Sequence, residues 1–148
     1  MPEPRQYKTA GAFRQSLEER LNQISQNQRI DLARLRRRVA FERLLARLFA
    51  DENPSCLLKG GYAIELRLDQ VARATKDIDL TIRNPSEAIP GGMSQPVAIR
   101  EWLQDKLEKD LNDWFVFRLG EQTNDLQAAP FGGARFHVEA RLDNRTFA

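Results

Sequence analysis

The sequence contains little of the chemistry that marks a secreted, membrane-spanning or zinc-binding protein. One cysteine, Cys56, and one histidine, His137, exclude an internal disulfide framework and a zinc site built from them. The apolar runs are only a few residues long, whereas a span of the bilayer needs about 20. The first residues lack the apolar segment of a signal peptide. We therefore expect a cytoplasmic protein that does not associate with membranes.

The charge is unevenly distributed along the 148 residues, of which 41% are apolar and 30% charged. Residues 1–50 carry 11 Lys and Arg against 5 Asp and Glu, whereas residues 51–148 carry 12 against 16. The basic excess is densest at residues 34–38. It suits a phosphate-bearing partner, or alternatively an ordinary solvated helix surface. The length and composition predict one globular domain.

Hydrophobic periodicity predicts helices first, and strands mixed with helices after them. The expected helices run from about residue 9 to 26 and over 31–50, 62–68 and 96–111, and the expected strands cover 56–58, 77–82, 114–119 and 135–142. This order predicts an α+β (mixed α/β) fold, a small mixed sheet with N-terminal helices packed on it. Residues 1–9 are interpreted as a flexible tail and residues 10–148 as a single domain.

Several apolar residues are assigned to the core rather than to a ligand. Cys56 lies in an apolar strand and is expected to pack as a small hydrophobe. The aromatic residues in the second half are more plausible as core than as a base-stacking platform: Trp102, Trp114, Phe115 and Phe117. The stripe of Phe13, Leu17 and Leu21 packs either on the domain or on a second subunit.

Asp77 and Asp79 are the most informative residues in the sequence. Residues two apart on a strand share a face, so the predicted strand places both carboxylates on one side and its alternating apolar residues on the other. Two like charges about 4 Å apart repel by about 4 kcal/mol at an effective dielectric constant of 20, and a shared cation relieves this repulsion. Carboxylate oxygens favour Mg²⁺, Mn²⁺ or Ca²⁺ over zinc.

A glycine pair lies upstream of these acids, after one predicted strand and before a short predicted helix. Gly60 and Gly61 allow a ligand to approach the backbone closely. A helix N-terminus also offers unpaired N–H groups and a positive dipole end to an anion. This element would therefore hold a triphosphate, and the acidic strand would hold the metal ion that bridges the phosphates. The arrangement is typical of phosphoryl or nucleotidyl transfer.

Further phosphate contacts are predicted for the basic and hydroxyl side chains around these two elements. Lys59 adjoins the glycines, and Arg73, Thr75 and Lys76 lead into the acidic strand. In the alternative interpretation, the two acids form an ordinary surface pattern that is ion-paired with Arg73 or Lys76.

These motifs resemble the signature of AbiEii/MenT-type nucleotidyltransferases, a family of the polymerase-β-like nucleotidyltransferase superfamily. The central match consists of LKGGYA at residues 58–63 and RATKDIDL at residues 73–80. FERLLARL at residues 41–48 is similar to the helix that precedes this signature, and GARFHVEARL at residues 133–142 to a later strand. The resemblance covers most of residues 30–148 and implies a nucleotidyltransferase-like fold.

The resemblance also implies an NTP-dependent enzyme that moves a nucleoside monophosphate to an acceptor, with Mg²⁺ or Mn²⁺ as cofactor. By position, Asp77 and Asp79 would be the catalytic, metal-binding residues, and Gly60 and Gly61 would cradle the triphosphate. Members act as toxins in toxin–antitoxin and phage-defence systems, and some modify the acceptor end of tRNA. The expected partners are therefore an NTP, an RNA or tRNA acceptor and a cognate antitoxin.

The sequence departs from this family at its third acidic ligand. Family members usually carry a third metal-binding Asp on a further strand, and residue 148 is reached about where that strand should begin. The domain is therefore interpreted as truncated before its third carboxylate. Glu139 is the best local substitute, and the alternative is a surface Glu paired with Arg141. Besides the toxin, two functions stay open: a catalytically impaired RNA- or protein-binding module, and a minimal nucleotidyltransferase antitoxin.

Overall fold

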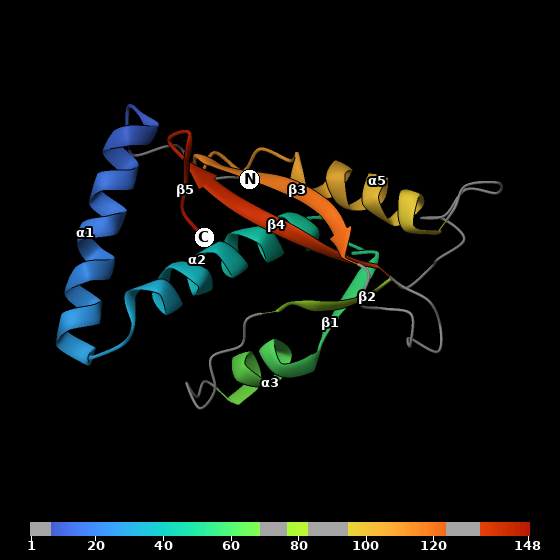
Figure 1. The fold of residues 1–148 in the computed structure, drawn as a ribbon, viewed down its shortest axis with the longest axis horizontal. Helices are drawn as coiled ribbons and strands as arrows, with labels where there is room; N and C mark the ends of the chain where they lie inside the picture. The colour runs from blue at the N-terminus through green and yellow to red at the C-terminus, as the bar shows by residue number, and fades with distance from the viewer. Residues whose placement is uncertain (1–6, 69–76, 83–94, 124–133) are drawn as a thin grey trace.

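The computed structural model describes residues 7–68, 77–82, 95–123 and 134–148, whose arrangement Figure 1 shows. Their elements, in chain order, are α1 (Ala10–Gln28), α2 (Leu32–Leu48), β1 (Cys56–Lys59), α3 (Gly60–Leu68), β2 (Asp79–Ile82), α5 (Gln95–Leu107), β3 (Phe115–Thr123), β4 (Arg135–Leu142) and β5 (Arg145–Thr146). Helices precede a mixture of strands and helices, so the predicted α+β class is confirmed.

Capping residues determine where the first two helices begin and where α1 ends. The Thr9 hydroxyl accepts a hydrogen bond from Ala12 N at 3.1 Å, and the Asp31 carboxylate accepts one from Arg34 N at 3.1 Å. Both side chains act as N-caps. Arg29 ends α1 in the left-handed conformation, with φ of +53°. The break between the predicted helices therefore lies at residues 29–31.

The strands form two separate antiparallel sheets within the described residues. β1 pairs with β2, so that Cys56 lies opposite Ile82 and Lys59 lies opposite Asp79. The other sheet has the order β3-β4-β5. β4 has the predicted bounds, whereas β3 begins one residue later than predicted and runs four residues further. The longer β3 is possible because its last residues still find partners at the beginning of β4.

The short strand β5 was not predicted. It follows a two-residue turn in which Asp143 and Asn144 have φ of +55° and +56°. Two positive φ values in a two-residue connection are typical of the tight β-hairpin turn that joins twisted strands. An Asp-Asn pair after a strand is therefore the sequence signal that marks this hairpin.

The helix α5 ends four residues earlier than predicted. Its expected last residue was Leu111, but the helix stops at Leu107. The Asp110 carboxylate accepts a hydrogen bond from Asn112 N at 2.8 Å, and Asn112 has φ of +56°. This local turn competes with the helix and directs the chain into β3.

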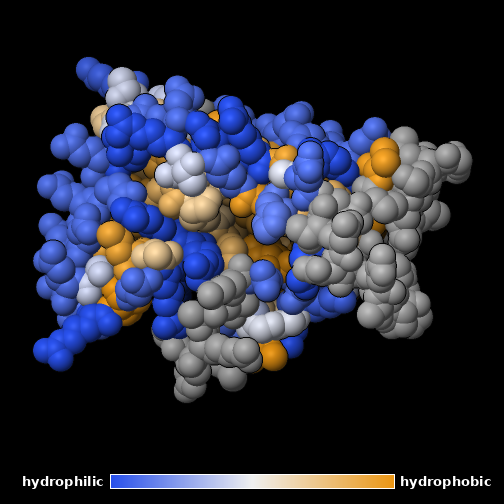
Figure 2. Space-filling view, viewed as in Figure 1, coloured by the Kyte–Doolittle hydropathy of each residue, from blue (hydrophilic) through white to orange (hydrophobic). Residues whose placement is uncertain are grey.

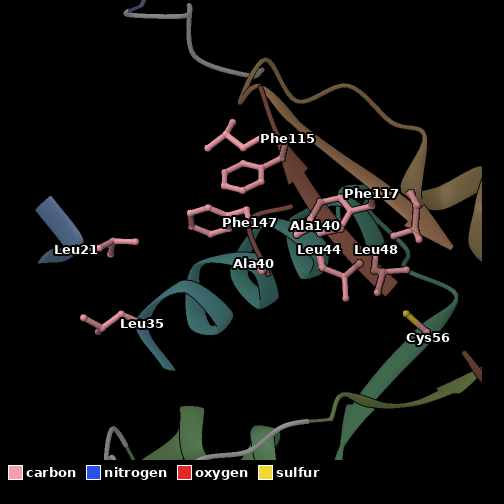
Figure 3. Close-up of a cluster of buried hydrophobic side chains, with 12 residues drawn as sticks. Leu21, Leu35, Ala40, Leu44, Leu48, Cys56, Phe115, Phe117, Ala140 and Phe147 are labelled. Carbon is pink, nitrogen blue, oxygen red and sulfur yellow. The ribbon is translucent and has the colours of Figure 1, made fainter. Parts of the chain in front are cut away.

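The core lies between α2 and the inner face of the three-stranded sheet. Figure 3 shows leucine and alanine side chains of α2 close to aromatic side chains of β3 and the C-terminus. The most buried members of this cluster, each 6% exposed or less, are Leu21, Ala40, Leu48, Cys56, Leu107, Phe115, Phe117, Ala140 and Leu142. The predicted core roles of Cys56 and of the two phenylalanines are therefore confirmed.

The N-terminal helix packs on its own domain. The ring of Phe13 meets the ring of Phe115 edge to face, with centroids 6.2 Å apart. Leu21 is only 5% exposed and belongs to the core cluster. The two alternatives left open for the stripe of α1 are thus decided in favour of packing within the chain.

The face of the molecule in Figure 2 is mainly hydrophilic over α1, and apolar side chains reach the surface near the centre of this face. Among the helices of the described residues, none has the length and apolarity to cross a bilayer.

A buried charged residue joins α2 to the chain just before β3. Arg47 is 2% exposed, and its guanidinium donates hydrogen bonds to Asp113 Oδ1 at 2.8 Å and Oδ2 at 2.9 Å. It also donates to the Phe115 carbonyl at 3.0 Å, and Arg43 donates to the same carboxylate at 2.7 Å. Burial raises the pKa of Asp113, but the hydrogen bonds from Arg47 and Arg43 outweigh it and lower the pKa overall.

We expect Asp113→Asn to lower the free energy of unfolding by about 3–5 kcal/mol, because it leaves a buried guanidinium without a counter-charge. Urea denaturation at pH 7 measures this loss.

Because pairing lowers its pKa, the Asp113 carboxylate stabilises the fold above its ordinary pKa of about 4, and this stabilisation disappears as the pH falls through the lowered value.

The matched control is Glu42→Gln, since Glu42 pairs with Arg38 at 3.7 Å on the surface. It should leave the urea midpoint nearly unchanged, as exposed pairs contribute little. Equal midpoints for the two variants would contradict the role given to the buried pair.

Candidate functional site

The candidate site is built by three consecutive elements, β1, α3 and β2. β1 runs directly into α3, and β2 returns antiparallel beside β1. The register places Lys59, the last residue of β1, opposite Asp79, the first residue of β2. Both side chains are exposed. The strand pairing therefore brings an ammonium group and a carboxylate to the point where the helix begins.

Gly60 lies directly against the Asp79 carboxylate. Its φ is +76°, a conformation that residues with a Cβ rarely adopt. A Cβ placed on Gly60 would overlap Asp79 Oδ2, and it would lie 3.2 Å from Cγ and 3.3 Å from Cβ of that aspartate. Only a glycine allows this approach, so the first glycine of the pair and the second acid of the Asp-x-Asp pattern are in contact.

Two details of the sequence prediction around this contact are corrected. The helix begins at Gly60 rather than at Tyr62, so the glycines form its first turn. The strand begins at Asp79 rather than at Asp77. β1 ends at Lys59, and the chain there turns into the helix, so β1 has no further residue that could pair with residues 77 and 78.

Asp77 nevertheless continues the alternation of the strand. Asp77 and Asp79 are exposed, whereas Ile78 between them is partly buried against the core cluster. Asp77 is therefore held next to the site by its apolar neighbour and not by strand hydrogen bonds. Three further predicted site residues, Arg73, Thr75 and Lys76, lie outside the described residues. The alternative in which Arg73 or Lys76 pairs with the acids lies outside them too.

The described residues around the acids offer a small donor set for a metal ion. Neither Asp77 nor Asp79 forms an ion pair with another described residue. In the described ranges, no three side chains of His, Cys, Asp or Glu lie close enough together to hold a metal ion. Asp77 and Asp79 are thus two exposed acidic side chains that lie two residues apart at the beginning of β2.

Glu139 is engaged elsewhere. It lies on β4, in the other sheet, where Arg141 donates to it at 2.9 Å and the Thr146 hydroxyl also donates to it. The hydrogen bond from Thr146 and the neighbouring Arg141 lower the pKa of Glu139. These contacts favour the surface ion pair over the role of a third metal ligand. His137, on the same strand, is exposed.

Tyr62 is a residue of the site region that the sequence did not single out. It follows the glycine pair, is 3% exposed, and packs edge to face on Phe41 of α2 with centroids 4.9 Å apart. Its hydroxyl is buried and has no hydrogen-bond partner among the described residues. Burial and the nearby Glu42 raise the pKa of Tyr62. The ring therefore anchors the first turn of α3 to α2; a lone tyrosine after two glycines carries no sequence signal for this role.

The family model described as nucleotidyl transferase AbiEii toxin, type IV TA system, matches residues 43–147. This chain belongs to the AbiEii family. No curated protein matches it. The match includes β1, α3 and β2, and thereby Gly60 and Asp79, whereas α1 and the first part of α2 precede it. The resemblance inferred from the motifs is confirmed. Membership in this family of nucleotidyltransferase toxins implies a nucleotide substrate and an antitoxin partner.

We expect Gly60→Ala to lower the free energy of unfolding by at least about 1 kcal/mol, because alanine disfavours a positive φ and its Cβ would displace Asp79. Gly61→Ala is the matched control, since Gly61 lies in the helix and does not share the positive φ. It should be neutral or slightly stabilising. Urea denaturation compares the two variants; identical midpoints would show that the contact with Asp79 is not tight.

We expect Tyr62→Phe to keep or raise the free energy of unfolding, because the substitution removes a buried hydroxyl that no described residue hydrogen-bonds. Tyr62→Ala, which also removes the ring from Phe41, should lower it by about 3 kcal/mol or more. Thermal and urea denaturation provide both values. A clear destabilisation by Tyr62→Phe would mean that the hydroxyl is hydrogen-bonded in solution.

Proposed function

We propose that this chain binds a nucleoside triphosphate with a divalent cation and transfers its nucleoside monophosphate to an acceptor hydroxyl. The observation that carries the proposal is the contact between Gly60 and the Asp79 carboxylate at the beginning of α3. It joins an acidic ligand for a cation to a helix end that suits phosphate. One cation-bound triphosphate would touch both.

The triphosphate would bind at the beginning of α3. The first turn of a helix presents N–H groups without intrahelical partners and the positive end of the helix dipole. Gly60 and Gly61 lack side chains that would keep a phosphate away, and Lys59 supplies a positive charge beside them. Additional contacts by Arg73, Thr75 and Lys76 are proposed from their place in the sequence alone.

The donor set of Asp77 and Asp79 fits a single hard cation. Mg²⁺ commonly takes one or two protein carboxylates and completes its octahedron with water and substrate phosphate, and Mn²⁺ accepts the same oxygen ligands. Both acids are exposed and form no ion pair with another described residue, so their oxygens are accessible. When bound, the cation would neutralise charge that develops on the pyrophosphate leaving group.

The other residues of the site would position the substrate for transfer. Lys59 and the α3 N-terminus would hold the phosphates that leave as pyrophosphate, and the two aspartates would fix the orientation of the triphosphate through the cation. We further propose RNA, such as tRNA, as the acceptor, and a role in phage defence, which the resemblance of the motifs to this family implies.

A second candidate is a binding module without catalysis. It is favoured by the small number of acids that cluster within the described residues. A binding module of this kind also needs a basic surface on the N-terminal helices. Part of the positive charge of these helices is neutralised by carboxylates of the same helices. Arg36 donates to both carboxylate oxygens of Glu18 at 2.7–3.1 Å, and Arg38 pairs with Glu42. These pairs weaken this alternative relative to the enzyme.

The decisive variants are Asp77→Asn and Asp79→Asn. We expect each to reduce Mg²⁺-dependent NTP binding at least tenfold, because an amide cannot supply the negative charge that holds the cation. Isothermal titration with each of the four NTPs, with Mg²⁺ and with EDTA, measures the affinities. Asp105→Asn is the control, an equal substitution at an exposed position of α5. The proposal is wrong if both site variants bind Mg²⁺–NTP as the parent chain does.

A further inference from the structure

The contact between Gly60 and Asp79 places a negative charge where the proposed phosphate site begins. The three heavy atoms nearest to a Cβ on Gly60 all belong to the Asp79 side chain, with Oδ2 the nearest and Cγ at 3.2 Å. α3 begins at Gly60, and the first turn of a helix is the part that attracts an anion. The carboxylate therefore lies against the same helix end that would hold the triphosphate.

The backbone on both sides of this contact is held in place. On one side, the pairing of β1 with β2 fixes Asp79 opposite Lys59. On the other side, the buried ring of Tyr62 packs on Phe41 of α2 and anchors the first turn of α3. The helix end and the strand are thus kept together, so the carboxylate can leave the helix end only by rotation about its own side-chain bonds.

The charges of the neighbouring site residues do not compensate this carboxylate. Lys59, Asp77 and Asp79 together carry a net charge of −1. Lys59 lies opposite Asp79 in the register, yet no ion pair joins the two side chains in the described part of the chain. A metal-free phosphate that approaches Gly60 therefore meets a net negative charge from these three residues, whereas a divalent cation on the two aspartates reverses its sign.

We infer that Asp79 keeps metal-free phosphate anions away from α3, so that the site admits a triphosphate only together with its cation. This inference rests on the proposed nucleotidyl transfer and specifies the form in which its substrate binds. Without a cation, the Asp79 carboxylate repels phosphate oxygens from the beginning of the helix. With a cation, the same carboxylate is a ligand, and the cation attracts the phosphates to the helix end. Inorganic phosphate and pyrophosphate without a metal ion are thereby excluded.

Asp77 provides the matched comparison. It carries the same charge two residues earlier, but it contributes none of the three atoms nearest to Gly60. In water, the interaction of two unit charges about 4 Å apart corresponds to about a fivefold change in affinity. Removal of the Asp79 charge should therefore raise the affinity for a metal-free anion by about this factor, and removal of the Asp77 charge should raise it less.

The test measures the binding of inorganic tripolyphosphate in EDTA by isothermal titration, at fixed pH and salt concentration. The variants are Asp79→Asn, Asp79→Ala and the control Asp77→Asn. Asparagine keeps the shape of the side chain but can donate a hydrogen bond to phosphate, whereas alanine removes the charge without adding a donor. Urea denaturation verifies that each variant is folded, and titrations with Mg²⁺–NTP are run in parallel.

We expect both Asp79 variants to bind metal-free tripolyphosphate about fivefold more tightly than the parent chain does, and Asp77→Asn less than twofold more tightly. With Mg²⁺–NTP the order reverses, because the Asp79 variants have lost a ligand of the cation. A gain in affinity does not arise from unfolding, so this result is specific to the removed charge.

Three outcomes in EDTA would overturn the inference. The first is that the Asp79 variants bind tripolyphosphate no better than the parent chain, or not detectably. The second is an equal gain for Asp77→Asn, because the contact with Gly60 would then be irrelevant. The third is a gain for Asp79→Asn alone, because its new hydrogen-bond donor would then be the cause.

A failure of the proposed function is recognised separately. If the parent chain does not bind Mg²⁺–NTP, the nucleotidyl transfer is wrong, whatever the titrations in EDTA give. If the parent chain binds Mg²⁺–NTP through Asp79, but the Asp79 variants gain no affinity for tripolyphosphate in EDTA, only the exclusion of metal-free anions by Asp79 is wrong.

Discussion

The ion pair of Arg47 and Asp113 is the interaction on which the arrangement of this fold depends. Its two charges lie almost out of contact with water, with exposed side-chain fractions of 1% and 11%. Removing them from water is costly, so the pair is tolerable only because nearly all of its polar atoms are hydrogen-bonded. The centre of the aromatic ring of Phe117 lies 4.9 Å from the guanidinium carbon of Arg47, and the ring covers another side of this group. This geometry fixes α2 relative to β3.

The position of the candidate site follows from that constraint. α2 is followed by β1, whose Cys56 belongs to the same core cluster as Leu48 and Phe117. Once α2 and the three-stranded sheet are fixed, the beginning of β1 is fixed as well, and the antiparallel register carries Asp79 to Gly60. The ring of Tyr62 on Phe41 holds the other side of the glycine turn to the same helix. The groups of the site are exposed, but rigid elements position them.

The N-terminal helix is an integral part of this domain although it lies outside the family match. α1 contributes Leu21 to the core, and Arg14 pairs with Asp143 at 3.3 Å in the turn between β4 and β5. Gly11 lies next to the same carboxylate, since a Cβ there would be 3.4 Å from its Oδ2. Through these contacts α1 covers one end of the sheet, although the family match over residues 43–147 does not include this helix.

The sequence by itself predicted the elements whose signals are local. The alternation of residues 135–142 gave a strand with the observed bounds, and the glycine pair next to an acidic strand indicated the contact that Gly60 and Asp79 make. The sequence predicted the end of α5 and the start of β2 less accurately. The ends of helices and strands depend on which neighbouring backbone groups are still available for hydrogen bonds. Asp77 lost its strand position for this reason.

Local patterns fix periodicity, turns and chemical type, because these depend on neighbours within a few residues. Only the tertiary structure decided which partners meet across the chain. The burial of Arg47 against Asp113, 66 residues away, has no signature in a helix that is otherwise rich in surface arginine. The register that sets Lys59 opposite Asp79 likewise depends on how both strands fit the core. Contacts between distant segments are energetically coupled to the whole packing, so a sequence pattern can suggest them but cannot select them.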